Sequence, residues 1–329
     1  MNTRSAGSTR WSLFVVCLWS VGSVTPSGAQ TLPRFHDPRP LTNREVALTL
    51  AVSNSSLHRV DTATNLPAWS PLWTFPSGAT SLQHTDSAAP YLPLRFYRAQ
   101  QVAGTNALVG DHLATTNGDV LIRPIRHASF VLSWNGKMIY NDPVGAASNY
   151  AGLPRADLIL VSHTHSDHFL ATTIDAVRGS NVVIVAPQAV FNSLSAPLRA
   201  FTTILTNGAT ANVLGLRVDA VPAYNANHAR GTGNGYVLTI GGRRLYMSGD
   251  TGDTPEMRAL PDIDVAFLCM NLPFTMSVTD AASATRAFRP KVVYPYHFQN
   301  QDSTFSDLND FKRRVGQDLG IEVRLRKWY

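Results

Sequence analysis

The feature that most constrains the fold is a set of potential metal ligands placed directly after an apolar run. Residues 158–161 are apolar and predict a buried strand, and the next seven residues contain His163, His165, Asp167 and His168. A segment that leaves the end of a strand is a loop, so its side chains can converge instead of alternating between two faces. Imidazole and carboxylate groups suit Zn²⁺, Mn²⁺ or iron. The motif therefore predicts a metal centre at the end of a strand.

Further ligands are expected from other parts of the chain. Four neighbouring ligands do not fit one tetrahedral ion comfortably, so near neighbours in a loop are expected to divide between two ions. Three more residues qualify because they lie at predicted strand ends or in a Gly-rich loop: Asp250, His297 and His228. Each would be an ordinary turn or structural residue if it stood alone. Because the His-rich motif needs further ligands, we interpret these three residues together as candidates for that role.

Hydrophobic periodicity predicts an α/β (α+β) domain from residue 119 onward. Strand patterns cover residues 120–125, 129–134, 137–140, 157–162, 182–186, 216–222, 236–240, 244–247, 265–269, 292–294 and 321–325. Helices are predicted at residues 174–178, 187–194, 255–260, 279–289 and 305–315, with Thr279 as an N-cap. Asn135-Gly136 is a two-residue hairpin signal. Strands that come first as hairpins and then alternate with helices predict sheets with helices outside them.

The first 29 residues have the features of a secretory signal peptide. Arg4 and Arg10 precede an apolar run at residues 11–24, and small residues follow up to Ala29, after which we expect cleavage. The apolar run is shorter than the roughly 20 residues that a membrane-spanning helix needs. The sequence therefore predicts a periplasmic or secreted protein with no membrane span after cleavage.

Residues 30–118 differ from the rest of the chain in composition. They are rich in Pro, Ser, Thr and Asn and have weak periodicity, which predicts an N-terminal extension packed on the main domain. Residues 42–45 fit a helix capping box. The residues that follow, however, alternate between apolar and polar from Val46 to Val52, as a strand would. Both interpretations of this segment stay open.

Cysteine and charge content narrow the function classes. Cleavage after Ala29 removes Cys17, so the mature chain keeps Cys269 alone and cannot form an internal disulfide. Cys269 lies in an apolar strand pattern and is expected to be a buried small hydrophobe. The formal net charge of +6 falls to +4 without Arg4 and Arg10. Basic residues form no stripe interleaved with aromatics, so we expect a small-molecule or lipid-like substrate and no nucleic acid.

Several motifs in a fixed order carry a family resemblance. They are Arg126-His127-Ala128-Ser129-Phe130 with Asn141-Asp142-Pro143, the motif from His163 to His168, Val221-Pro222-Ala223-Tyr224-Asn225, Gly235-Tyr236-Val237, Ser248-Gly249-Asp250-Thr251 and residues 291–297. With these motifs, residues 119–298 resemble the metallo-β-lactamase superfamily. The nearest branch is that of ascorbate-phosphate lactonase-like and N-acylphosphatidylethanolamine phospholipase D-like hydrolases. The resemblance implies a four-layer αββα sandwich, a hydrolase domain at residues 119–329 and two metal ions at one edge.

The resemblance also implies which residues hold the two divalent ions, for which we expect Zn²⁺, with Mn²⁺ or iron as alternatives. The first two histidines of the motif would hold one ion, and Asp167, His168 and His297 the other, with Asp250 bridging both. The third ligand of the first ion departs from the family pattern. Asn225 occupies the place nearest the usual histidine, and His228 comes three residues later. We expect His228 to be the ligand and leave Asn225 as the alternative.

A metal-bound hydroxide would be the nucleophile, because a single Zn²⁺ lowers the pKa of water from ~16 to ~7. Asp167, which would orient the hydroxide, and Asp250 are the expected catalytic residues. Asp142 would either fix a ligand imidazole or be a plain turn residue, and His127 would either face the substrate or be structural.

The predicted function is an exported hydrolase of an ester, lactone or phosphodiester. The alternatives are a metal-binding protein of the same fold without hydrolysis (redox or mononuclear iron dioxygenase), a nuclease and a β-lactamase. Diiron oxygen reductases of this fold usually carry Glu where His165 stands, and β-lactamases usually carry Cys where Asp250 stands.

Overall fold

The chain forms two compact units. The computed structural model describes residues 15–19, 33–52, 57–66, 68–76, 78, 80–102 and 109–329. The units are Met1–Gly104 and Thr105–Tyr329. The sequence places the division after residue 118, whereas the structure places it after Gly104. The reason is that β8 (Gly110–Thr115) pairs in an antiparallel register with β9 (Gly118–Arg126) and therefore belongs to the second unit.

The first unit is a β-sandwich. In one sheet β1 (Val15–Trp19), β7 (Arg95–Val102), β4 (Leu57–Ala63) and β5 (Ser70–Phe75) are neighbours, and in the other β2 (Arg34–Pro40), β3 (Val46–Ala51) and β6 (Ser81–Asp86). A short 3₁₀ turn, η1 (Ala89–Tyr91), precedes β7. Burial alternates along β3, and side chains from both sheets share one hydrophobic core. The segment after residue 45 is thus a strand, as its alternation indicates.

The predicted leader is described only at β1. The structure pairs Val15–Trp19 with β7 in a parallel register. The predicted cleavage site after Ala29 lies outside the described residues. None of the helices in the described part of the chain reaches the length and hydrophobicity that a transmembrane span requires.

The second unit contains two sheets with the same internal plan. One runs β8-β9-β10-β11-β12-β13-β14 and the other β15-β16-β17-β18-β19-β20-β21. In each, the early pairs are antiparallel and the later ones parallel. The strands of the first sheet after β9 are β10 (Ser129–Trp134), β11 (Lys137–Asn141), β12 (Ala156–Leu160), β13 (Arg178–Ala186) and β14 (Thr202–Ile204). Those of the second are β15 (Thr210–Val213), β16 (Leu216–Asn225), β17 (His228–Ile240), β18 (Arg243–Met247), β19 (Val265–Cys269), β20 (Val292–Tyr296) and β21 (Glu322–Val323).

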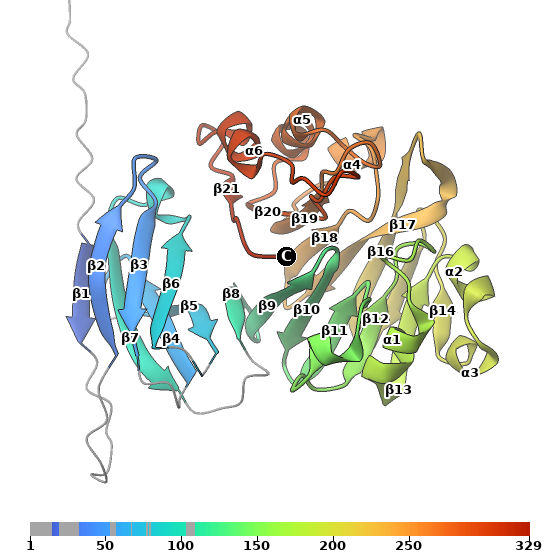
Figure 1. The fold of residues 1–329 in the computed structure, drawn as a ribbon, viewed down its shortest axis with the longest axis horizontal. Helices are drawn as coiled ribbons and strands as arrows, with labels where there is room; N and C mark the ends of the chain where they lie inside the picture. Colours follow the sequence, from blue (N-terminus) through green and yellow to red (C-terminus); the bar gives the residue numbers. More distant parts are fainter. Residues whose placement is uncertain are drawn as a thin grey trace, which may run out of the picture. The chain divides into compact units, whose positions relative to one another are not determined.

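Helices cover the outer face of each sheet of the second unit. Beside the first sheet lie η3 (Ala147–Tyr150), α1 (Ala171–Val177), α2 (Gln188–Ser193) and α3 (Ala196–Arg199). Beside the second lie α4 (Pro255–Arg258), α5 (Val278–Phe288) and α6 (Leu308–Val315). Figure 1 shows α1–α3 and α4–α6 on opposite sides of the unit. This order of layers confirms the predicted αββα sandwich.

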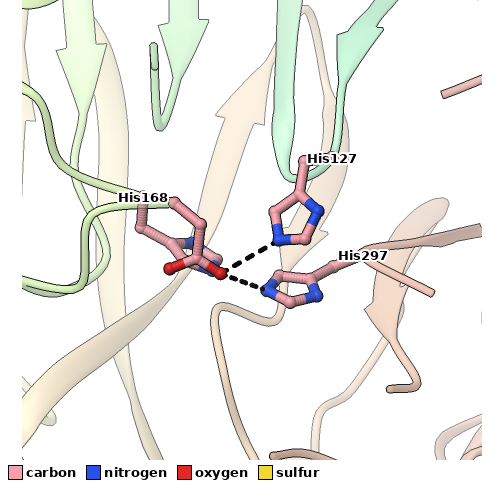
Figure 2. A group of neighbouring side chains, drawn as sticks. His127, His168 and His297 are labelled. Atoms are coloured by element: carbon pink, nitrogen blue, oxygen red, sulfur yellow. Dashed lines mark hydrogen bonds and ion pairs between the residues drawn. The ribbon is translucent and has the colours of Figure 1, made fainter. Parts of the chain in front are cut away.

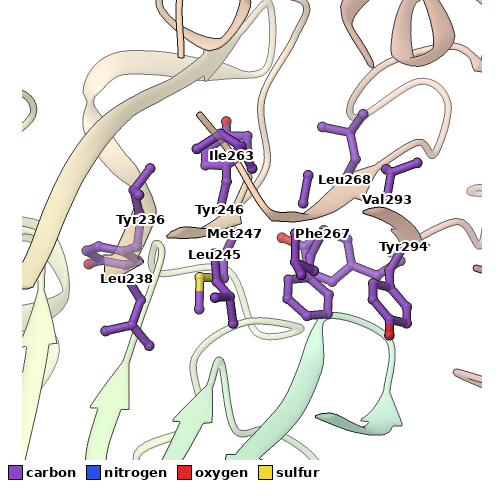
Figure 3. Packing of buried hydrophobic residues seen from close by; sticks show 14 of the residues in the cluster. Tyr236, Leu238, Leu245, Tyr246, Met247, Ile263, Phe267, Leu268, Val293 and Tyr294 are labelled. Atoms are coloured by element: carbon purple, nitrogen blue, oxygen red, sulfur yellow. The ribbon is translucent and has the colours of Figure 1, made fainter. Parts of the chain in front are cut away.

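Aromatic side chains fill the space between the two sheets. The ring of Phe267 on β19 stacks on Phe130 of β10, with centroids 4.1 Å apart, and on Tyr294 of β20, at 5.1 Å. In Figure 3, Phe267 and Tyr294 point to one side of their sheet, and Leu268 and Val293 point to the other. This alternation is what a sheet covered on both faces requires.

Candidate metal centre

The His-rich motif leaves β12 as a tight turn that gathers its side chains. The backbone N–H groups of His168 and Phe169 both donate to the carbonyl of His165, at 2.9 and 2.8 Å. This turn places His163 and His168 in the interior, where they are 5% and 0% exposed. His165 stays at the surface. The motif therefore supplies both buried and solvent-exposed candidate ligands.

One group of candidate ligands, which we call the first cluster, consists of His163, His165, His228 and Asp250. One ligand atom from each lies within 4.8 Å of the others. Nε2 of His228 lies 3.2 Å from Nδ1 of His165 and 3.5 Å from Oδ2 of Asp250. Nε2 of His163 lies 3.8 Å from the same carboxylate oxygen. Three imidazoles and one carboxylate thus meet at one point.

Of the two alternatives for this cluster, the structure brings in His228 and leaves Asn225 behind it. Oδ1 of Asn225 lies 2.9 Å from Nδ1 of His228 and accepts the backbone N–H of the same residue at 3.1 Å. The two residues face each other where β16 turns into β17. Asn225 therefore orients the His228 ring, and Nε2 of that ring is left for the cluster.

The second cluster consists of His127, Asp167, His168 and His297. Oδ2 of Asp167 lies 3.0 Å from Nε2 of His127 and 3.3 Å from Nε2 of His297. Nε2 of His168 lies 3.9 Å from the same oxygen. Figure 2 shows the three imidazoles converging from separate segments. His127, which is not among the predicted ligands, lies in the turn between β9 and β10.

Asp250 lies between the two clusters and faces both. It follows the end of β18 and is 4% exposed. Its Oδ1 lies 3.1 Å from Nε2 of His168 and 3.3 Å from Nε2 of His297. Its Oδ2 faces His163 and His228 of the first cluster, at the distances given above. Each oxygen of this carboxylate is thus directed at a different cluster.

Asp142 supports the second cluster from behind. Its Oδ2 lies 2.8 Å from Nδ1 of His168. Its Oδ1 accepts the backbone N–H of Ser162 at 2.7 Å, and the Ser162 hydroxyl donates to Oδ2 at 2.7 Å. Both carboxylate oxygens are therefore hydrogen-bonded inside the protein. Of the two roles considered for Asp142, the geometry is that of a residue that fixes an imidazole.

The electrostatics of the clusters follow from burial and from the carboxylates. Burial lowers the pKa of His163 well below its usual value. Burial also acts against the protonated form of His168, but the Asp250 and Asp142 carboxylates raise the pKa of this imidazole well above its usual value. Burial would raise the pKa of Asp250, yet the surrounding imidazoles, His168 and His297 foremost, hold it below the usual range. The site thus stabilises charged carboxylates in the interior.

Several buried ligand atoms lack a hydrogen-bond partner within the described residues. They are Nε2 of His163, His168 and His297 and Oδ1 of Asp250. Buried polar atoms in native proteins are nearly always paired. A divalent transition-metal ion binds imidazole nitrogens and carboxylate oxygens, so it would give these atoms the partner that they lack. The residues present therefore fit metal ions at both clusters.

Three residues at this site adopt the left-handed backbone region. The φ angles are 53° at His127, 40° at Asp142 and 46° at His297. Non-glycine residues rarely adopt such angles, and they gather at functional sites where the surrounding structure enforces them. Each lies at or just after a strand end.

Exposed apolar side chains gather around the clusters. Among the described residues, five of the eight exposed large hydrophobic side chains lie on site loops, and we call them the apolar rim: Leu170, Leu272, Phe274, Phe305 and Tyr329. Leu170 follows His168 by two positions. Two carbonyls of the 272–274 loop accept hydrogen bonds from Asn225 and Asn227, beside His228. Phe305 and Tyr329 pack on Phe298, the neighbour of His297.

Cys269 has the position that the sequence predicts for it. It is fully buried on β19 and belongs to neither cluster. Burial raises the pKa of its thiol to about 11. It is therefore a neutral, apolar core side chain at physiological pH.

Tyr329 is a site residue that sequence reasoning missed. Its hydroxyl lies 2.7 Å from Nδ1 of His127, from which it is 202 residues distant in the chain. No local pattern around residue 329 could indicate this contact. Only the packing of the chain's last residues beside the β9–β10 turn brings it there.

Comparison with known proteins gives a consistent result. A profile described as the beta-lactamase superfamily domain matches residues 122–297. A UPF0173 metal-dependent hydrolase of Thermococcus kodakarensis is 31% identical over 215 residues, which cover 62% of this chain and 96% of that protein. A solved structure from Parabacteroides distasonis, described as that of a metal-dependent hydrolase, is 39% identical with a TM-score of 0.60, and covers 68% of this chain and 100% of its own.

A likeness of fold extends further along the chain. The diiron β-hydroxylase CmlA of Streptomyces venezuelae has a TM-score of 0.52 at 15% identity, over 86% of this chain and 68% of its own. This share is larger than the second unit alone. The comparison therefore extends to part of the first unit, as a similarity of fold.

Proposed function

The chain belongs to the metallo-β-lactamase superfamily, and we propose that this metal-dependent hydrolase cleaves an ester, lactone or phosphodiester bond in a substrate that carries an apolar group. The observation that carries the proposal is the position of Asp250, whose two oxygens each face two imidazole nitrogens. A carboxylate in that position is suited to bridge two ions. Two-metal sites are typical of hydrolysis at carbonyl and phosphoryl centres.

The two clusters divide the ligands in this proposal. The first cluster would hold one ion, and the second cluster, together with Oδ1 of Asp250, would hold the other. Divalent ions bound there supply a Lewis acid and a water of lowered pKa. Asp167 is the carboxylate ligand open to solvent, with 45% of its side chain exposed. Its carboxylate is placed to accept a hydrogen bond from the attacking water and so to orient it.

The substrate's apolar group would contact the apolar rim. Phe305 and Leu272 are 52% and 50% exposed. Exposed apolar groups that gather in one place mark a binding surface, whereas scattered ones need no explanation. An open depression of about 410 Å³ adjoins the rim, lined by Leu272, Pro273, Asn300, Gln301 and Asp302. Leu272 and Pro273 would contact an acyl or aryl group, and the polar side chains of the depression would face the polar part of the substrate.

The test is metal analysis coupled to a substrate panel. We expect about two transition-metal ions per chain, and turnover of at least one class among carboxylic esters, lactones and phosphodiesters. No metal after reconstitution would overturn the dinuclear centre. One tightly held iron without hydrolysis would favour the dioxygenase alternative, and turnover of β-lactams alone would favour a β-lactamase.

The role of the rim has its own test. With p-nitrophenyl acetate and octanoate as a matched pair, Phe305→Ser should lower kcat/KM for octanoate roughly 10-fold, because a buried apolar side chain contributes on the order of 1.5 kcal/mol. The acetate rate should change little. Leu66→Ser, at an apolar residue 51% exposed in the first unit, is the control. Equal losses with both esters would show that the rim does not contact the acyl group.

We further propose that the protein is exported. The support is the basic start, the short apolar run and the small residues before Ala29. N-terminal sequencing of the protein from cell fractions should find Gln30 first, outside the cytoplasm. An intact N-terminus on a cytoplasmic product would contradict this.

A further inference from the structure

Two side chains that carry hydrogen-bond donors meet over Gly145, in a loop next to the second cluster. Gly145 follows by three positions Asp142, which supports His168. A Cβ atom on Gly145 would lie 2.8 Å from Nδ2 of Asn149 and 3.1 Å from Nη1 of Arg126. Because glycine has no Cβ, the two nitrogens border one small space. We call Arg126, Gly145 and Asn149 the donor cradle.

The loop that carries the cradle is held in place by hydrogen bonds. The Tyr150 hydroxyl accepts the backbone N–H of Val144 at 2.9 Å. The Thr173 hydroxyl donates to the carbonyl of Gly145 at 2.5 Å. Gly145 has a φ angle of 83°, which residues with a side chain rarely adopt. Backbone conformation and lack of space thus both favour glycine here, so the cradle is formed before any ligand binds.

The cradle lies near the open side of the metal centre. Arg126 is the last residue of β9 and directly precedes His127, whose Nε2 lies 3.0 Å from Oδ2 of Asp167. Burial raises the pKa of Tyr329, and the Arg126 charge acts on the same hydroxyl in the opposite direction. Tyr329 belongs to the apolar rim. An anion in the cradle would therefore lie beside both the second cluster and the rim.

The donors of the cradle have no acceptor of their own. Arg178, Arg230 and Arg258 each pair with a carboxylate. Arg126 and Asn149 are exposed, and neither side chain has a hydrogen-bond or ion-pair partner in the part of the chain that the structure describes. A guanidinium offers only donors, and an amide NH₂ offers two. Donors that border one space are complementary to the oxygens of a carboxylate or phosphate.

We propose that Arg126 and Asn149 form an anion subsite, which binds a carboxylate or phosphate group of the substrate away from the scissile bond. This inference rests on the hydrolase function proposed above and narrows its substrate class. The substrate would carry an anionic group in addition to an apolar one. Arg126 is then a residue that determines specificity, because a substrate without the anionic group does not pair with its charge.

The direct test is an NMR titration of the arginine side chains. The zinc-loaded protein with ¹⁵N-labelled arginine gives one Nε–H signal per ordered side chain, and the signal lost in Arg126→Gln identifies Arg126. Benzoate, phenylphosphonate and the neutral benzamide are the probes. We expect the Arg126 signal to shift and saturate with benzoate or phenylphosphonate, and not with benzamide. The anion that binds identifies the group as a carboxylate or a phosphate. No shift with either anion would overturn the subsite.

Variants separate the cradle from the metal ions, which also attract anions. Arg126→Gln should weaken binding of the responding anion about 10-fold, because it removes charge-assisted hydrogen bonds. Asn149→Asp should weaken it as well, since the new carboxylate would pair with Arg126. The control is Arg155→Gln, at an exposed arginine before β12, at the opposite end of that strand from the His-rich motif. Unchanged affinity in Arg126→Gln would assign anion binding to the metal ions and overturn the proposal.

Kinetics with matched esters distinguish this inference from the proposed function. Arg126→Gln should raise KM for 4-acetoxybenzoate about 10-fold more than KM for its methyl ester, with little change in kcat, because the anionic group is remote from the reacting bond. If phenylphosphonate is the anion that binds, 4-acetoxyphenyl phosphate replaces the benzoate. Equal changes in KM for both esters would contradict the subsite. Turnover of neither ester, with the Arg126 signal still responding, would count against ester hydrolysis and leave the subsite in place.

Discussion

The two clusters share Asp250 but differ in the residues that support them. Behind His168 in the second cluster lies a carboxylate, Asp142, and behind His228 in the first lies an amide, Asn225. The pKa values of the two imidazoles shift in opposite directions. Carboxylates raise that of His168 in spite of its burial, whereas burial lowers that of His228.

The difference indicates how tightly each cluster would hold an ion. Three carboxylates surround the second cluster, Asp142, Asp167 and Asp250, whereas the first relies on three imidazoles and one oxygen of Asp250. Negative charge in a buried site strengthens the binding of a divalent cation. Imidazole-rich sites suit Zn²⁺, and carboxylates also accept Mn²⁺. We therefore expect the second ion to be held more tightly, with a broader choice of metal.

The largest expected effect comes from the residue that the clusters share. Asp250→Ala removes an oxygen from each cluster, so activity should fall by more than ~100-fold, the upper end for groups that only support ligands. Both ions should be lost or weakly held, as measured by metal content on variants with native circular dichroism. The control is Asp253→Ala, which breaks only a surface pair with Arg258. Retention of two ions and near-normal turnover in Asp250→Ala would disprove the bridging position.

A smaller loss is expected when the support of the second cluster is removed. Asp142→Ala leaves Nδ1 of His168 without its carboxylate and should lower activity roughly 10–100-fold. The second ion should weaken more than the first, as measured by stepwise chelation. If the first ion instead lost more affinity than the second, relative to the unmodified protein, the assignment of Asp142 to the second cluster would be wrong.

The corresponding change in the first cluster should be milder. Asn225→Ala removes a neutral hydrogen-bond acceptor behind His228, so we expect a loss of about 10-fold or less. In this variant the first ion should lose more affinity than the second, relative to the unmodified protein. Asp142→Ala and Asn225→Ala should therefore have opposite effects on the two ions when a chelator is added stepwise. Effects of Asn225→Ala equal to those of Asp142→Ala would mean that charge is not what separates the clusters.

Cys269 should affect neither cluster. With a thiol pKa raised to about 11, only about one molecule in a thousand carries a thiolate at pH 8, so thiolate reagents should react very slowly with the native protein. The reactive fraction should grow as the pH rises toward that pKa. Unfolding should release one thiol per mature chain and two if Cys17 is retained. Fast labelling of the folded protein that also displaces metal would place Cys269 at the site.

Local signals in the second unit predicted its elements well. Asn135 and Gly136 have φ angles of 47° and 76°, as the hairpin turn that they predict requires. The N-cap of α5 is an exception, since Ser277 accepts the N–H of Asp280 in place of the predicted Thr279. The predicted boundary was two residues late because a second hydroxyl lies close by. An error of two residues at a helix end does not change the predicted αββα order of the layers.

What the sequence could not indicate depends on tertiary contact. β17 begins at His228, eight residues before its predicted start at residue 236, through a Gly-rich stretch of low strand propensity. Pairing with β16 overrides that propensity. Gly235 is needed there because a Cβ would lie 2.9 Å from the carbonyl oxygens of Met247 and Ser248. The motif residues of both clusters were found from local chemistry, whereas His127 and Tyr329 depended on segments 202 residues apart.

The left-handed turns at His127, Asp142 and His297 also bear on how this site can evolve. Each such residue costs roughly 1 kcal/mol or more of folding stability compared with glycine at the same place. Replacement by glycine would therefore relieve strain while removing the chemistry, a trade of function for stability. β-branched residues would add strain as well as lose the side chain. The backbone conformation alone thus restricts which single substitutions these three positions tolerate. The metal chemistry restricts them further.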